Sequence, residues 1–187
     1  IVVAAISNLS TAYNLANVSL TVLLLKANGH TMTGIASGVL SAAIFAGAIV
    51  GQLTMGYVGD YVGRRQALQA TIALSVLGAL LSSLPVGSTD DIFAQLAGAR
   101  FVLGVGAGGV YPLAATMSSE SSKSKATSGS TVSLVFSTQG IGQCLVPLVA
   151  IFLWYSLDTD KSASGASGAL YWRLLLGLGA IPGIVVL

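Results

Sequence analysis

The residues best suited to chemistry lie in one apolar stretch, ARFVLGVGAGGVYPLAATMSSE, which runs from Ala99 to Glu120. It holds a single arginine, Arg100, near its start and a Tyr111–Pro112 pair past its middle. Placing an arginine at membrane depth costs roughly 2.5 to 3.5 kcal/mol on insertion scales, so Arg100 needs a partner or a function. Because proline removes one backbone donor and loosens a helix, Tyr111 stands beside a suitable place for a ligand or a hinge.

Glycines make the same stretch suited to close packing. Gly104 and Gly108 lie one helical turn apart, with Gly106 and Gly109 beside them. Because glycine has no side chain, a neighbouring backbone or a substrate can approach such a helix closely. We expect this stretch to form a central helix around which the other elements are arranged.

The composition shows that the solvent of this chain is lipid. Of its 187 residues, 54% are hydrophobic and only 7% are charged, whereas soluble domains carry about 25% charged residues. The net charge of +2 comes from eight basic and six acidic side chains, which are too few and too scattered for a nucleic-acid surface. We therefore expect an integral membrane protein and no nucleic-acid partner.

Enzymatic chemistry is not expected from this sequence. No nucleophile, base and third group occur together, and no spacing is typical of metal ligands. We therefore expect neither a cofactor nor a metal. The single cysteine, Cys144, lies in an apolar run without a second cysteine, and we interpret it as a small buried residue.

Six stretches are long and apolar enough to cross the hydrocarbon core, which takes about 20 residues of helix. They lie near residues 1–26, 34–58, 66–84, 92–117, 127–156 and 170–187. The sequence therefore predicts an all-α membrane protein in which residues 1–187 form one bundle of six transmembrane helices. Because the chain begins and ends inside apolar runs, we expect it to belong to a longer protein.

The first of these stretches carries polar side chains on one helical face: Ser7, Ser10, Asn14, Asn17 and Thr21. In a membrane helix such a stripe faces protein or a watery cavity and not lipid. Two interpretations stay open, hydrogen bonding between helices and the lining of a cavity.

Basic residues predict the orientation. The loops after the second and fourth stretches hold Arg64, Arg65, Lys123 and Lys125, whereas the loops on the opposite side are mainly acidic. Basic loops stay in the cytoplasm, so we expect these two loops on the cytoplasmic side.

Two motifs in this sequence resemble motifs of a known family, the major facilitator superfamily. The run from Gly51 to Leu68 is similar to that superfamily's Gly-x-x-x-Asp-Arg-x-Gly-Arg-Arg motif, with Tyr61 in place of the first arginine; the matching residues are Gly56, Asp60, Gly63, Arg64 and Arg65. Arg100, Gly104 and Gly106 match its fourth-helix pattern, Arg-x-x-x-Gly-x-Gly. The resemblance implies a cytoplasmic charge lock formed by Asp60, Arg64 and Arg65. It also implies that residues 1–187 are the N-terminal six-helix half of a twelve-helix fold, a 3+3 inverted repeat, with a midplane site between the halves.

Within that superfamily, the chain resembles the phosphate:proton symporters. The run GVGAGGVYPLAATMSSE is similar to their signature Gly-Gly-Asp-Tyr-Pro-Leu-Ser-Ala-Thr-x-x-Ser-Glu, and FSTQGIG, from Phe136 to Gly142, to their Phe-Ser-Met-Gln-Gly-x-Gly. The resemblance places Tyr111 and Gln139 at substrate-binding positions. From the residues alone, Gln139 and Gln143 either tie helices together or bind a polar substrate.

The departures from that family concern acids. Val110 replaces the aspartate before Tyr111, and Thr11 and Asn14 replace both aspartates of the family's Asp-x-Tyr-Asp. No Asp or Glu remains inside the six apolar stretches. Without a titrating carboxyl group, a helix cannot relay a proton by a change of charge, which puts proton coupling through this part of the protein in doubt.

The preferred hypothesis is a secondary transporter that moves phosphate or a related small anion by alternating access. Tyr111 and Gln139 would donate hydrogen bonds to the substrate, and Asn14 would be a neutral group in the cavity. For Arg100, direct contact with the anion and pairing with carbonyl groups inside the bundle both stay open.

Two alternatives remain, a carrier of sugars or organic solutes and a non-transporting membrane subunit of a larger complex. The expected partners are the lipid bilayer, a second six-helix half and the small anion. Whether protons are also transported stays open. We expect the plasma membrane as the location, and an organelle membrane is the alternative.

Overall fold

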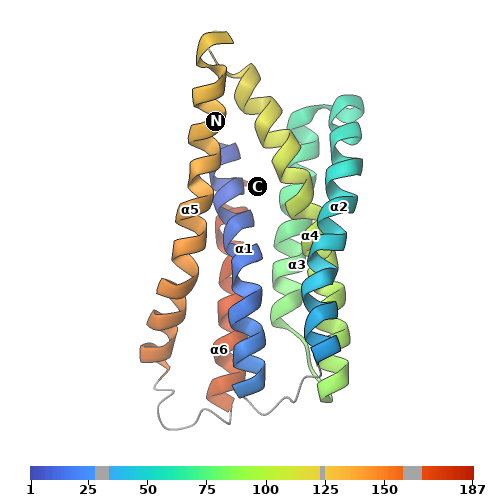
Figure 1. Cartoon of the computed structure of the whole chain (residues 1–187), viewed down its shortest axis with the longest axis vertical. Coiled ribbons are helices and arrows are strands. Elements are labelled where there is room, and N and C mark those ends of the chain that lie inside the picture. Colours follow the sequence, from blue (N-terminus) through green and yellow to red (C-terminus); the bar gives the residue numbers. More distant parts are fainter. Residues whose placement is uncertain (28–33, 123–124, 158–165) are drawn as a thin grey trace.

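The computed structural model describes residues 1–27, 34–122, 125–157 and 166–187, and all of its regular elements are helices. Figure 1 shows them lying side by side along the long axis of the molecule. Their bounds are α1 (Val2–Ala27), α2 (Gly34–Val62), α3 (Arg64–Ser83), α4 (Thr89–Glu120), α5 (Lys125–Ser156), α6 (Ala166–Gly177), the short 3-10 helix η2 (Leu178–Ala180) and α7 (Ile181–Val186). The all-α prediction is confirmed for this part of the chain. Lys123, used above for the orientation, lies outside the described residues.

Within the described residues, five helical segments are long and apolar enough to cross a membrane, and they coincide with the predicted second to sixth stretches. They are Gly34–Val62, Arg64–Ser83, Thr89–Glu120, Thr127–Ser156 and Gly168–Val186. The predicted first stretch forms α1, a helix of 26 residues, but is not among the five. Its serines, threonines and asparagines lower its hydropathy, and most of them are buried in the bundle.

Glycines bring α2 and α4 together along most of their length. A Cβ atom added at any of four glycines would collide with a backbone carbonyl oxygen of the facing helix; these are Gly47 and Gly51 on α2 and Gly104 and Gly108 on α4. Such small-residue contacts let two membrane helices pack backbone to backbone. The predicted close packing of the Ala99–Glu120 stretch is therefore confirmed, with α2 as its neighbour.

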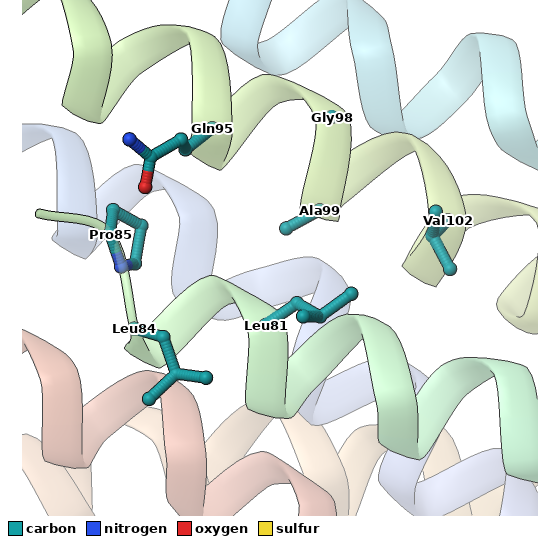
Figure 2. Close-up of a pocket in the computed structure, with 7 residues that line it drawn as sticks. All are labelled: Leu81, Leu84, Pro85, Gln95, Gly98, Ala99 and Val102. Carbon is teal, nitrogen blue, oxygen red and sulfur yellow. The ribbon is translucent and has the colours of Figure 1, made fainter.

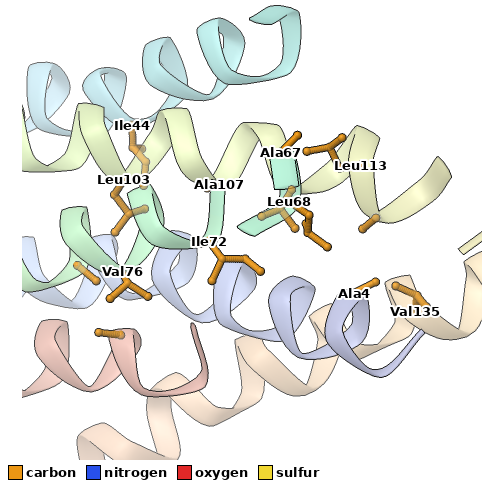
Figure 3. Packing of buried hydrophobic residues seen from close by; sticks show 14 of the residues in the cluster. Ala4, Ile44, Ala67, Leu68, Ile72, Val76, Leu103, Ala107, Leu113 and Val135 are labelled. Carbon is orange, nitrogen blue, oxygen red and sulfur yellow. The ribbon is translucent and has the colours of Figure 1, made fainter. Parts of the chain in front are cut away.

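The other face of α4 packs on α3, and the two helices contribute much of the main core. Figure 3 shows Leu103 and Ala107 of α4 among Ile72 and Val76 of α3 and Ile44 of α2. Ala4 of α1 and Val135 of α5 belong to the same cluster of buried side chains, as drawn at the far end of that view, so the core joins all five long helices.

The last membrane segment is helical throughout but not a uniform α-helix. α6 gives way to η2 at Leu178, and α7 follows with Pro182 in its first turn. Polar side chains of α1 donate hydrogen bonds to this segment: Tyr13 Oη to the carbonyl of Leu175 (3.0 Å) and Ser10 Oγ to that of Gly179 (3.2 Å). For Ser10 and Tyr13, the structure therefore favours the first interpretation of the polar side of α1, hydrogen bonding between helices.

Candidate functional site

A charge cluster ties together the ends of three helices. Gly63, with φ of 108°, lets the chain turn from α2 into α3 within one residue. Nη1 of Arg64, at the start of α3, lies 2.5 Å from Oε1 of Glu120 at the end of α4, and Nη2 lies 3.7 Å from Oδ1 of Asp60 on α2. Arg65 is exposed. For the charge lock, the resemblance pointed to Asp60 and Arg64 but missed Glu120. Its place in the polar run just after the fourth predicted stretch was the available signal.

Arg100 is buried at the contact between α4 and α1. Its side chain is 1% exposed, and Nη1 donates a hydrogen bond to the backbone carbonyl of Asn14 at 3.1 Å. The acidic residues of the described chain, which are Asp60, Asp90, Asp91 and Glu120, all lie near helix ends. Arg100 therefore places a positive charge inside the bundle with a carbonyl dipole, and not a carboxylate, as its protein partner.

Asn14 faces the last membrane segment at η2. Its side-chain Nδ2 donates to the carbonyl of Gly179 at 2.9 Å and to that of Ser10 at 3.0 Å. Its Oδ1 is buried and has no hydrogen-bond partner among the described residues. The residue thus joins α1 to η2 through its amide nitrogen and keeps one free acceptor oxygen.

The structure brings the two proposed substrate donors into one region between α4 and α5. The ring of Tyr111 stacks on that of Phe136, with the ring centroids 6.2 Å apart and the planes inclined by 23°. Gln139 follows Phe136 by three residues on α5, so it lies on the same face of that helix. Both Tyr111 and Gln139 are half-buried, as expected of side chains at the wall of a site.

Two further asparagines on α1 lack partners. Asn8 and Asn17 are fully buried, and none of their side-chain nitrogen and oxygen atoms has a hydrogen-bond partner within the described residues. Buried polar atoms nearly always find a partner in protein or water. No pattern in the sequence predicts this, because a stripe of polar residues does not reveal which of them will find hydrogen-bond partners.

The prediction for Cys144 was wrong. This cysteine is exposed on α5. The physical reason is that α5 packs on α1 along one side only, so an apolar run there does not imply burial inside the bundle.

Two cavities differ in character. Figure 2 shows an open pocket of ≈ 340 Å³ between α3 and α4, walled by apolar side chains such as Leu81, Leu84 and Val102 with Gln95 at one end. A much smaller cavity of ≈ 10 Å³ lies between α1, α3, α4 and α7. Thr11 and Val110, where the sequence departs from the resembled family, line this same small cavity.

Comparisons with known proteins agree with the motifs. A family model described as "Sugar (and other) transporter" matches residues 1–187. The chain is 38% identical over 157 residues to "Inorganic phosphate transporter PT2" of Toxoplasma gondii, covering 82% of this chain and 26% of that protein. It is 37% identical over 202 residues to "Inorganic phosphate transporter 1-6" of Oryza sativa subsp. japonica, covering 97% of this chain and 38% of the relative.

Solved structures agree on the fold. The partially occluded inward open conformation of the xylose transporter XylE from E. coli superposes with a TM-score of 0.83 at 22% identity, covering 99% of this chain and 45% of XylE. The chain thus spans less than half the length of the proteins that it matches. The family model matches this chain from end to end, and five apolar spans lie within its described residues. This chain is therefore a multi-pass integral membrane protein and belongs to the sugar and other transporters of the major facilitator superfamily.

Proposed function

We propose that this chain is one six-helix half of a secondary transporter that moves inorganic phosphate, or a related small anion, by alternating access. The observation that carries the proposal is Arg100, a positive charge buried inside a bundle whose described acids all lie near helix ends. In a low-dielectric interior an unneutralised positive charge favours the binding of an anion over that of a neutral solute or a cation. The naming of the curated relatives as inorganic phosphate transporters supports the same class of substrate.

Each candidate residue receives a role that fits its surroundings. Tyr111 and Gln139, half-buried on α4 and α5, donate hydrogen bonds to the anion. Arg100 attracts the anion through its field and its remaining N–H groups. Asn14 fixes α1 against η2 and, as a neutral residue, adds no negative charge that would repel the substrate.

The architecture proposed for the whole protein is two such halves around a central site. Within this half, α2 packs on α4 and α5 packs on α1. That pairing is expected of a 3+3 inverted repeat, in which the first helix corresponds to the fourth and the second to the fifth. The plasma membrane remains the proposed location. Lys123 and Lys125 would face the cytoplasm with Arg64 and Arg65.

The test is uptake of radiolabelled phosphate by the full-length protein in liposomes. We expect unlabelled phosphate and arsenate to compete, and xylose and glucose not to compete. Gln139→Ala should reduce uptake, whereas Gln143→Ala, one turn further along the helix and exposed, should not. Equal uptake by both variants, or competition by sugars alone, would reject the proposal.

A sugar carrier is the second candidate, because the family description names sugars and the solved neighbours are xylose transporters. Competition by xylose in the same assay would support it. The third candidate, a non-transporting subunit, predicts uptake of neither solute and a fixed association with other chains, which the mass of the native assembly would show.

A further inference from the structure

Asn8 of α1 has a buried amide whose use the contacts described so far leave open. Its side chain is fully buried, and neither Nδ2 nor Oδ1 has a hydrogen-bond partner within the described residues. A buried amide with both atoms unpaired is costly, because it has given up its hydrogen bonds to water. A polar group that reaches Asn8 in another state of the protein would therefore be favoured there.

α1 and α5 run in the same direction along their contact. Thr138 Oγ1 of α5 donates to the carbonyl of Ala5 on α1 at 2.9 Å. Four residues further along both helices, a Cβ atom added at Gly142 would collide with the carbonyl of Leu9. The two contacts advance by the same number of residues on each helix, so residues that are neighbours at one level have neighbouring successors one turn later.

This alignment brings Gln139 beside Asn8. Ala4 of α1 and Val135 of α5 belong to one cluster of buried side chains, and Figure 3 draws them beside each other. Four residues later on each helix stand Asn8 and Gln139, which lie on the same helix faces as Ala4 and Val135. Asn8 is fully buried at this contact, whereas Gln139 is half-buried. Gln139 is therefore the side chain of α5 that is placed to meet the Asn8 amide.

A glutamine that binds an anion must turn its nitrogen toward that anion. The Gln139 amide has a donor side, Nε2, and an acceptor side, Oε1, which have nearly the same shape. The donor side attracts an anion, and the acceptor side repels it. A hydrogen-bond donor placed behind Oε1 would hold the amide in the attractive orientation, as supporting hydrogen bonds do for the groups of a binding site.

We propose that Asn8 is a positioning residue for the proposed anion site. When the anion binds, Nδ2 of Asn8 donates to Oε1 of Gln139 and turns Nε2 of Gln139 toward the anion. This inference rests on the proposed function. It requires no contact between Asn8 and the anion, in agreement with the full burial of Asn8. Gln139 is only half-buried, so its side chain can turn toward Asn8 without repacking the core.

Asn17 offers a matched control on the same helix. It is fully buried, and its two amide atoms also lack hydrogen-bond partners within the described residues. It follows Asn8 by about two and a half helical turns, so it lies on the opposite face of α1. A substitution of Asn17 therefore removes the same buried amide without touching Gln139.

The neighbourhood of the two amides is tested first, without phosphate. In the full-length protein with Cys144→Ser, Asn8→Cys is combined with Gln139→Cys, and a diffusible oxidant is added. We expect a disulfide, seen as the loss of both thiols to labelling in denaturant. Asn17→Cys combined with Gln139→Cys should keep its thiols. No disulfide in the first pair, or equal disulfide formation in both pairs, would overturn the proposal.

The role in binding is tested by a double-mutant cycle, with phosphate affinity measured by calorimetry. Asn8→Leu should weaken phosphate binding about tenfold, which corresponds to one net hydrogen bond. In the Gln139→Ala background the same substitution should change the affinity by less than about twofold, because no amide is left to position. Asn17→Leu should leave the phosphate affinity unchanged in both backgrounds.

The outcomes separate this inference from the proposed function. A tenfold loss that persists for Asn8→Leu in the Gln139→Ala background would overturn the proposal, since Asn8 would then act without Gln139. Unchanged phosphate affinity in Asn8→Leu would also overturn it and leave the phosphate carrier standing. No phosphate binding by the wild type would reject the carrier, and with it the role of Asn8 in binding that anion.

Discussion

The two sides of this bundle are held together by different chemistry. α2 and α4 meet through four glycines, with backbone against backbone and no polar side chain required. α1 meets its neighbours through hydroxyl and amide groups: Thr138 Oγ1 of α5 donates to the carbonyl of Ala5 at 2.9 Å, and Asn14 bonds to Gly179. The glycine contact is complete in itself, whereas α1 retains buried amide atoms without partners among the described residues.

We interpret the α2–α4 contact as a rigid support and the polar face of α1 as the part that can bind a ligand. A glycine contact has no open hydrogen-bonding capacity, so it neither gains from a ligand nor changes with hydration. The polar face of α1 has buried amide atoms without partners among the described residues. Arg100, the small cavity between α1, α3, α4 and α7, and the last membrane segment all adjoin this face. We therefore expect binding and movement on the α1 side, and rigidity on the α2 side.

The largest expected effect concerns the glycine contact. A Cβ at Gly104 would collide with the carbonyl of Ile44, whereas one at Gly98 of the same helix meets nothing within 4 Å. Gly104→Ala should lower the free energy of unfolding by about 1–3 kcal/mol because the helices must separate. Gly98→Ala should raise it by about 0.5–1 kcal/mol. Unfolding in detergent checks both, and equal effects of the two substitutions would mean that α2 and α4 do not meet closely.

The next effect distinguishes satisfied from unsatisfied amides on α1. Asn14→Leu removes hydrogen bonds to Gly179 and Ser10 and should cost about 1–2 kcal/mol of stability. Asn17→Leu removes an amide whose two atoms have no partner in the described chain, so the stability should stay unchanged or rise by about 1 kcal/mol. The same unfolding assay measures both. A loss for Asn17→Leu as large as that for Asn14→Leu would show that Asn17 is bonded after all.

The smallest effect concerns the charge cluster at the ends of α2, α3 and α4. Glu120→Gln weakens the pair with Arg64, both partners of which are partly exposed, so the loss should be about 0.2–1 kcal/mol and should vanish in high salt. Arg65→Gln serves as the comparison, because Arg65 forms no ion pair with the described residues. Titrating stability against salt measures both variants, and a salt-independent loss for Glu120→Gln would contradict the charge cluster as its cause.

The sequence predicted the helices well because apolar length is a local property. The second to sixth stretches appear as apolar spans, and the glycines of α4 proved to be contact points. α1 shows the limit of that reasoning, since its buried polar stripe lowers its hydropathy although the helix lies within the bundle. The prediction that Cys144 is buried was wrong because an apolar run in a membrane helix can face outward.

The candidate site depended on tertiary register, which no local pattern contains. Nothing in the sequence showed that Thr11 and Val110 would line one cavity, or that Arg100 would donate to the backbone of Asn14 and not to a side chain. The stacking of Tyr111 on Phe136 likewise required the packing of α4 against α5. The resemblance pointed to candidate positions, and the structure shows which residues lie beside them.

The most direct test of the central claim is equilibrium binding of phosphate to the full-length protein by calorimetry. Tyr111→Phe keeps the ring that stacks on Phe136 and removes only the hydroxyl proposed to bind the anion. Losing one hydrogen bond to a charged ligand should weaken binding by about 10- to 100-fold. Tyr57→Phe, at an exposed stacked ring on α2, should bind as the wild type does. Unchanged phosphate affinity in Tyr111→Phe, or no phosphate binding by the wild type, would contradict the account.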